Sequence, residues 1–157
     1  HLSIRRQRQM CIRDSPPSDE IIKKFSAKKF DTLEDVLKDS DYVTLHCPGG
    51  GDNTNLMNKE RFSLMKKSAF LINTARGDVV DENALVQALK DNVIAGAGLD
   101  VYAKEPVVTE ELLNMQNVVL IPHLGSATTE TRVAMGLRSL ENVEAFFDGK
   151  EPGDRVA

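Results

Sequence analysis

The chain has 157 residues, of which 41% are hydrophobic and 28% are charged, a balance typical of one globular domain. No apolar stretch approaches the roughly 18 residues that a membrane span needs, which excludes a transmembrane protein. The net charge of −4 argues against nucleic acid as the main partner. Cys11 and Cys47 form neither a disulfide framework nor a zinc pattern, and the three histidines lack ligand spacing. We therefore expect a cytoplasmic protein with no metal site.

Residues 1–15 differ in charge from the rest of the chain. They carry four arginines and one aspartate, a net of +3, so the other 142 residues sum to −7. Such a segment could be a disordered arm or an Arg-rich transit peptide. The string QRQMCIRDS also resembles translated adaptor sequence that contaminates assembled sequencing reads, and the chain begins at His1 rather than at Met. We expect residues 1–15 to be such an artefact and leave them out of the fold prediction.

From residue 16 onward, apolar strands alternate with helices. Strands are predicted over residues 42–46, 69–73, 93–101 and 118–121. Helices are predicted over residues 33–38 and 59–67, capped by Thr32 and Asn58, and from Asp81 or Asp78 to about residue 89. A long amphipathic helix follows over residues 128–147, with Gly149 as its stop signal. Apolar strands separated by helices predict a parallel sheet with helices on both faces.

A doubly wound nucleotide-binding sheet consists of two halves, the first of which carries a glycine-rich phosphate loop. No G-x-G-x-x-G motif occurs here, and residues 96–101 end in valine within a predicted strand, so their glycines serve packing. The predicted fold class is therefore α/β, corresponding to the second half of a doubly wound parallel sheet of the Rossmann type.

Four polar clusters follow the predicted strands, where ligands bind in open α/β sheets. They are residues 46–48, 73–82, 98–106 and 122–128. Arg76 offers a planar guanidinium that fits a carboxylate, and His123 offers an imidazole, the natural proton donor near neutral pH. Together with Asp100 and Glu105 they suit a 2-oxo acid whose carbonyl becomes a hydroxyl. Each has a structural alternative when taken alone, such as a surface salt bridge for Arg76 or a backbone-capping role for His123.

The strings NTARGDVVDENAL, AGAGLDVYAKEP and IPHLGSAT resemble the D-isomer-specific 2-hydroxyacid dehydrogenase family. Together with LHCPGG they are most similar to its glyoxylate and hydroxypyruvate reductase branch, and the resemblance runs from about residue 32 to residue 157. It implies NAD or NADP as cofactor, a small 2-oxo or 2-hydroxy acid as substrate, and a homodimer for the full-length protein.

This resemblance also implies roles for individual residues. Arg76 matches the arginine that holds the substrate, and His123 matches the histidine that donates a proton as hydride passes from the nicotinamide to C2. Glu105 matches the acid that keeps this histidine charged. The cofactor-binding residues implied are Cys47, Pro48, Thr74, Ala75, Arg76, Asp100, His123, Gly125 and Ser126.

The resemblance divides the chain into a partial NAD(P)-binding domain, residues 16–127, and a crossover helix with the tail of the substrate domain, residues 128–157. The phosphate loop, the residue that selects NAD or NADP, and most of the substrate domain are expected upstream. We therefore expect the chain alone to bind dinucleotide poorly and to turn over little. The alternatives are phosphoglycerate, D-lactate and phosphite dehydrogenases of the same family, a dinucleotide-sensing corepressor-like protein, or an inactive remnant.

Overall fold

The computed structural model describes residues 18–155, so the expected leader, residues 1–15, lies outside the described residues. The chain divides into two compact units, His1–Pro122 and His123–Ala157, and each is described by itself. The elements in order are α1 (Asp19–Phe25), α2 (Leu33–Asp39), β1 (Tyr42–Leu45), η1 (Gly51–Asn53), α3 (Lys59–Leu64), β2 (Phe70–Asn73), η2 (Gly77–Val79), α4 (Glu82–Lys90), β3 (Gly96–Leu99), α5 (Glu110–Leu113), β4 (Val118–Leu120) and α6 (Thr129–Phe147).

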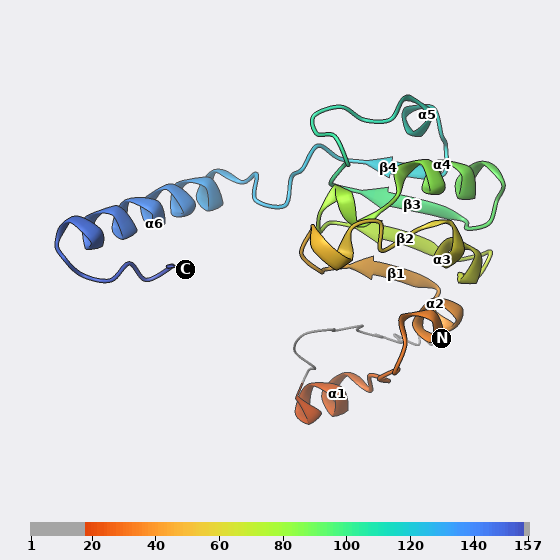
Figure 1. Ribbon diagram of the computed structural model, residues 1–157, viewed down its shortest axis with the longest axis horizontal. Coiled ribbons are helices and arrows are strands. Elements are labelled where there is room, and N and C mark those ends of the chain that lie inside the picture. Colours follow the sequence, from red (N-terminus) through yellow and green to blue (C-terminus); the bar gives the residue numbers. More distant parts are fainter. Residues whose placement is uncertain (1–17, 156–157) are drawn as a thin grey trace, which may run out of the picture. The chain divides into compact units, whose positions relative to one another are not determined.

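The four strands form one parallel sheet in the order β1-β2-β3-β4 (Figure 1). Leu45, Asn73, Leu99 and Leu120 form one row across the sheet, so all four strands end at the same edge. The predicted strands are confirmed, although the third is shorter than residues 93–101. The N–H of Val93 donates instead to the Ala88 carbonyl at the end of α4.

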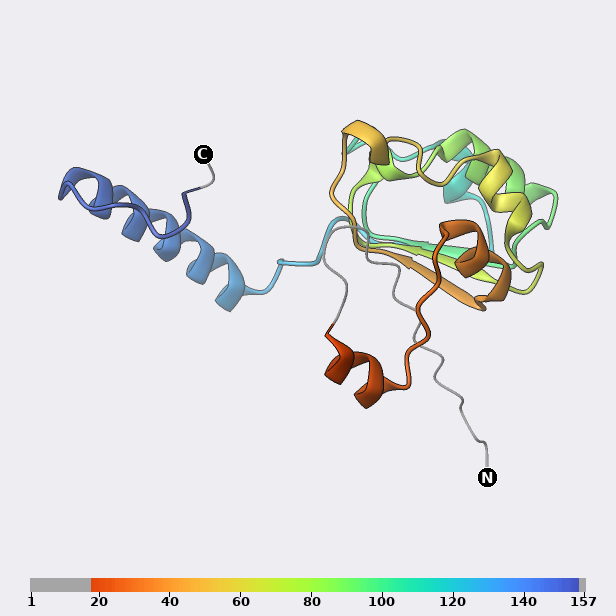
Figure 2. The same ribbon diagram turned by 60° about the horizontal axis from the view of Figure 1, so that its bottom comes forward.

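Helices α2 to α5 lie on one face of this sheet (Figure 2). The core between them and the strands includes Leu37, Phe62, Leu71, Leu85, Leu99 and Leu112. On the other face, Tyr42 and Val119 remain 71% and 67% exposed. The expectation of helices on both faces is therefore wrong for α2 to α5. Right-handed crossovers that add strands in chain order keep every connection on one face, and only a reversal of strand order uses the other face.

The helices of this unit begin at polar caps. The predicted caps Thr32 and Asn58 are confirmed: their side-chain oxygens accept from backbone N–H groups three residues later, at 3.2 and 3.0 Å. At α4 the cap is Asp81, which accepts two N–H groups at 3.0 and 3.1 Å, rather than Asp78. The sequence did not predict α1 and α5, of seven and four residues. Helices this short show little periodicity, and Thr109, which precedes α5, makes no side-chain cap hydrogen bond of the kind that marks α2 and α3.

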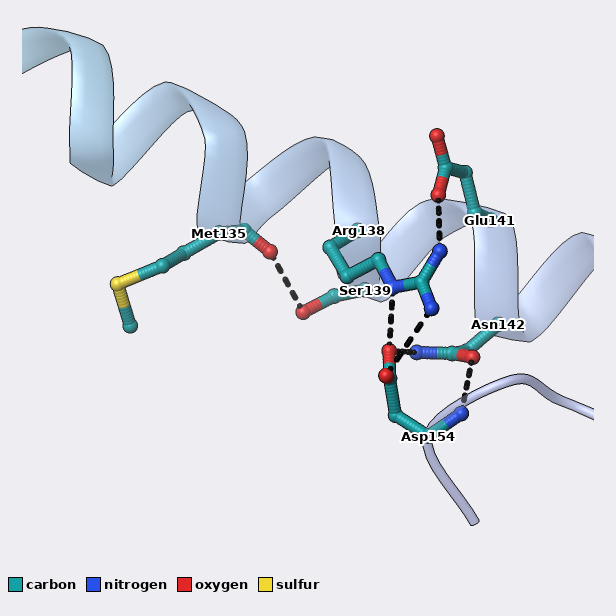
Figure 3. A network of polar contacts seen from close by, with 6 residues as sticks. All are labelled: Met135, Arg138, Ser139, Glu141, Asn142 and Asp154. Carbon is teal, nitrogen blue, oxygen red and sulfur yellow. Dashed lines mark hydrogen bonds and ion pairs between the residues drawn. The ribbon is translucent and has the colours of Figure 1, made fainter. Parts of the chain in front are cut away.

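The second unit consists mainly of α6, which Thr128 caps where the sequence predicted a helix. No residue of α6 is buried. A polar network joins α6 to the C-terminal segment that follows it, which we call the tail (residues 148–155) (Figure 3). Arg138 donates to Glu141 at 3.0 Å and to both carboxylate oxygens of Asp154 at 2.5 and 3.0 Å, while Asn142 Nδ2 donates to Asp154 at 2.8 Å.

This network predicts how the tail responds to acid. The hydrogen bond from Arg138 holds the pKa of the Asp154 carboxyl below its usual value of 3.8. Because the pKa of this carboxyl is lower in the folded chain, its bond to Arg138 contributes its full stability above pH 3.8. That contribution is lost as the pH falls through the pKa of the folded chain. The Asp154 carboxyl carbon, followed by NMR, should titrate below pH 3.8, and in R138Q it should titrate closer to 3.8. Titration at or above 3.8 in the unaltered chain would contradict the network.

Candidate active site

Three loops leave the carboxyl edge of the sheet, and we name them L1 (residues 46–55, after β1), L2 (74–81, after β2) and L3 (100–109, after β3). In the first unit, the predicted site residues Cys47 and Pro48 lie in L1, Thr74, Ala75 and Arg76 in L2, and Asp100 and Glu105 in L3. Because the strands end in register, the three loops start from neighbouring positions at the edge.

The conformation of L2 is set by Asn73, the last residue of β2, whose side chain is only 1% exposed. Its Nδ2 donates to the carbonyl of Arg76 at 2.9 Å, and its Oδ1 accepts from the N–H of Ala75 at 3.1 Å. This clasp closes a tight turn. The Arg76 side chain is exposed, and its Nη1 donates to the carbonyl of Ala75 at 2.7 Å. A buried amide side chain needs hydrogen-bond partners, and Asn73 finds both of them in the backbone of L2. Asn73 therefore fixes the backbone that carries Arg76.

L3 begins with a buried carboxylate and a buried phenol. Asp100 is 4% exposed, and its backbone N–H donates to the carbonyl of Asn73 at 2.9 Å. Tyr102 is 7% exposed, and its hydroxyl lies 2.8 Å from the carbonyl of Ile121 and 3.3 Å from that of Leu99. Glu105 is exposed, and its Oε1 accepts from the N–H of Tyr102 at 3.0 Å. The Glu105 carboxylate is thus held against the backbone of its own loop.

The environment of Tyr102 predicts an alkaline transition. Burial raises the pKa of this phenol above its usual value of 10.0, opposed by its hydrogen bond to Ile121. Because the pKa of this phenol is higher in the folded chain, the buried neutral hydroxyl contributes its full stability below pH 10.0. That contribution is lost as the pH rises through the pKa of the folded chain. The chain has two tyrosines, so absorbance at 295 nm of Y42F reports on Tyr102 alone. Ionisation in the folded chain should occur above pH 10.0, and a midpoint at 10.0 or lower would contradict the burial.

L2 and L3 contact each other at Gly77. A Cβ at this position would overlap the carbonyl carbon and oxygen of Tyr102, and would lie 2.5 Å from the nitrogen of Ala103. Only glycine lets the backbones approach so closely. The residue after Arg76 therefore lies directly against the loop that carries Glu105.

L1 and L2 are joined by Asp78. Its Oδ2 accepts from the N–H of Gly50 at 2.6 Å, and its carbonyl accepts from the N–H of Asn55 at 2.8 Å. A Cβ at Gly49 would lie 2.5 Å from the Asp78 carboxylate and 3.1 Å from the Arg76 side chain. The three loops therefore form one connected framework, with L2 in the middle.

The remaining predicted site residues, His123, Gly125 and Ser126, belong to the second unit and precede α6. His123 is exposed and has a φ of 51°, in the left-handed region that non-glycine residues seldom adopt. Such conformations cluster at functional sites.

The structure brings together L1, L2 and L3, and it shows residues that join these loops and to which the sequence assigned no role at the site. These are Asn73, Gly77, Asp78 and Glu82. They all lie in the NTARGDVVDE string, which was their only signal, because their partners are 21 or more residues away except for those of Asn73. Within residues 18–155, no group of three or more His, Cys, Asp or Glu side chains could hold a metal ion. No helix in that range is long and apolar enough to cross a bilayer.

Comparison with known proteins agrees with this architecture. Residues 8–125 match the family described as D-isomer specific 2-hydroxyacid dehydrogenase, NAD binding domain. The glyoxylate reductase of Pyrococcus horikoshii is 49% identical over 134 residues, which cover 85% of this chain and 40% of that protein.

Two solved structures are also similar. The NADPH-dependent glyoxylate/hydroxypyruvate reductase of Sinorhizobium meliloti, in complex with NADP and malonate, superposes with a TM-score of 0.81 and 39% identity, covering 83% of this chain and 41% of that one. The holo form of D-mandelate dehydrogenase from Rhodotorula graminis gives 0.84 and 33%, covering 92% and 43%. The chain thus spans about 40% of the relatives that it matches. On its fold, its motifs and this match, the chain belongs to the NAD-binding domain family of the D-isomer-specific 2-hydroxyacid dehydrogenases.

Proposed function

We propose that this chain supplies the nicotinamide-binding half and the catalytic residues for the reduction of a small 2-oxo acid, glyoxylate or hydroxypyruvate, to the 2-hydroxy acid. The observation that carries the proposal is the framework of L1, L2 and L3, in which Gly77 places the Arg76 loop against the Glu105 loop. The names of the relatives, glyoxylate reductase and glyoxylate/hydroxypyruvate reductase, support this choice of substrate.

Each catalytic residue has a role that its chemistry supports. The exposed guanidinium of Arg76 binds the substrate carboxylate and carbonyl through paired N–H donors. His123 donates a proton to the carbonyl oxygen, since imidazolium is available near neutral pH. The family resemblance assigns Glu105 as the acid partner of this histidine. All three positions project from loops rather than from the core, as expected of residues that contact a ligand.

The residues at the edge of the sheet fit a nicotinamide dinucleotide. Asp100 provides a buried carboxylate at the end of β3, suited to accept the N–H groups of a carboxamide. Thr74 and Ala75 would line the same group from L2, Cys47 and Pro48 would flank the adenosine side, and Gly125 and Ser126 would follow the catalytic histidine. When bound, the cofactor supplies the hydride. NAD and NADP both remain candidates.

For the complete protein, we propose a homodimer in the cytoplasm. The dimer comes from the family resemblance. The cytoplasmic location rests on the cysteine usage, since two cysteines at this spacing provide no disulfide framework.

A chimera supplies the part of the relatives that this chain does not span. In this chimera, residues 18–155 replace the matching segment of the Pyrococcus horikoshii glyoxylate reductase, which aligns over 134 residues. Oxidation of NADH and NADPH is followed at 340 nm with glyoxylate, hydroxypyruvate, pyruvate and 3-phosphohydroxypyruvate. We expect the highest kcat/KM with glyoxylate or hydroxypyruvate.

Two further results bear on the proposal. The 157-residue chain alone should show little turnover and weak quenching in a fluorescence titration with NADH or NADPH. A folded chimera that prefers pyruvate or the phosphorylated substrate would contradict the assigned substrate, and a folded chimera inactive with all four would contradict the reductase function.

A further inference from the structure

L3 is anchored at two points by one side chain that the catalytic proposal does not use. Glu82 Oε1 accepts from the N–H of Ala103 at 2.6 Å, and Glu82 Oε2 accepts from the hydroxyl of Thr109, also at 2.6 Å. These two partners lie two residues before and four residues after Glu105. A single carboxylate therefore closes the loop on both sides of the proposed catalytic acid.

The anchor lies next to the contact that holds Glu105 itself. The N–H of Tyr102 donates to Glu105 at 3.0 Å, and the next N–H along the chain, that of Ala103, donates to Glu82. Two consecutive N–H groups are thus bound by two different carboxylates, and hydrogen bonds to charged acceptors are stronger than neutral ones. If the Glu82 carboxylate is lost, the segment between Ala103 and Thr109, which carries Glu105, loses its side-chain bonds to α4 at both ends.

Glu82 is itself rigidly placed. It is the first residue of α4, directly after the cap Asp81, and it is only partly exposed. The same helix is held in the core by Leu85 and Leu89, which are 0% and 3% exposed. A glutamate at a helix N-terminus is also stabilised by the helix dipole. The Glu82 side chain thus ties L3 to a helix that is fixed in the core.

We infer that Glu82 is a positioning residue that sets the orientation of Glu105 and, through it, the competence of the proton donor. This inference rests on the proposed function, because it assigns Glu82 a role in the same reaction. It predicts that loss of the Glu82 carboxylate lowers kcat rather than raising KM, since Arg76, which binds the substrate, is fixed by Asn73 and not by Glu82.

The first arm of the test uses the 157-residue chain and needs no activity. Amide hydrogen exchange is measured by NMR for the unaltered chain, E82A, E82Q and the control E60A, which removes a first-turn glutamate from α3. We expect exchange at Ala103 to rise at least about tenfold in E82A. It should rise less in E82Q, whose amide oxygen still accepts a hydrogen bond, and should stay unchanged in E60A. An unchanged rate at Ala103 in folded E82A overturns the inference.

The second arm uses the chimera. We expect E82A to lower kcat by about 10- to 100-fold, the usual effect of losing a residue that orients a functional group, with KM within about twofold. In an E105Q background, the same substitution should have no further effect on kcat, because residues that act through each other are not additive. Independent, additive losses overturn the inference. A chimera inactive toward every 2-oxo acid counts against the proposed function alone, and the exchange arm still decides whether Glu82 anchors L3.

Discussion

Replacement of Gly77 by alanine is expected to destabilise the first unit by about 3 kcal/mol, the upper end of the cost of overpacking. The added methyl group would overlap the backbone of Tyr102, and neither partner can yield as the end of a flexible side chain would. L2 and L3 must therefore separate, and the Arg76 and Glu105 backbones move apart. Thermal unfolding followed by circular dichroism should show Tm lowered by roughly 10–20 °C.

The matched control is G136A. Gly136 lies within α6, where a Cβ would meet nothing within 4 Å, so alanine should leave the first unit unchanged and raise the helicity of α6 slightly. If G77A unfolds at the same temperature as the unaltered chain, L2 and L3 do not make the contact described here.

The second large effect is expected at the proton donor. In the chimera, H123N should lower kcat/KM for the 2-oxo acid by a factor on the order of 10²–10⁴, the usual contribution of a general acid. Asparagine tolerates the left-handed backbone that His123 adopts. The substitution therefore removes the imidazole that donates the proton and leaves the backbone conformation unchanged.

Another histidine of the same chain serves as the control for H123N. His46 is exposed, and its Nε2 lies 2.9 Å from the hydroxyl of Thr44. H46N should therefore keep kcat/KM within about twofold of the unaltered chimera. Equal losses in both variants would show that the effect at His123 is not specific, and full activity of H123N would remove His123 from the mechanism.

The strands and the caps were predictable because their signals are local. A run of apolar residues ended by glycine, proline or polar residues marks a buried strand. A side chain such as that of Asn58 or Asp81 binds N–H groups two or three residues away, so the same short stretch of sequence contains both partners.

The single covered face and the framework of loops were not predictable in this way. Strand order decides which face the helices cover, and no local pattern contains that order. Glu82 binds Ala103 and Thr109, 21 and 27 residues away, and Asp78 binds Gly50, 28 residues away. The sequence indicated that Arg76 and Glu105 follow neighbouring strands, but the bonds that join their loops exist only once the sheet has formed. The catalytic and cofactor-binding roles of these residues remain predictions.

L2 and L3 are in backbone contact at the carboxyl edge of the sheet. A nuclear Overhauser measurement on the ¹³C,¹⁵N-labelled chain at neutral pH tests this contact. One Hα of Gly77 points along the bond on which an added Cβ would lie 2.5 Å from the nitrogen of Ala103. A strong cross-peak between a Gly77 Hα and the Ala103 amide proton is predicted. With both resonances assigned and sharp, absence of that cross-peak would show that the backbones of L2 and L3 are not in contact.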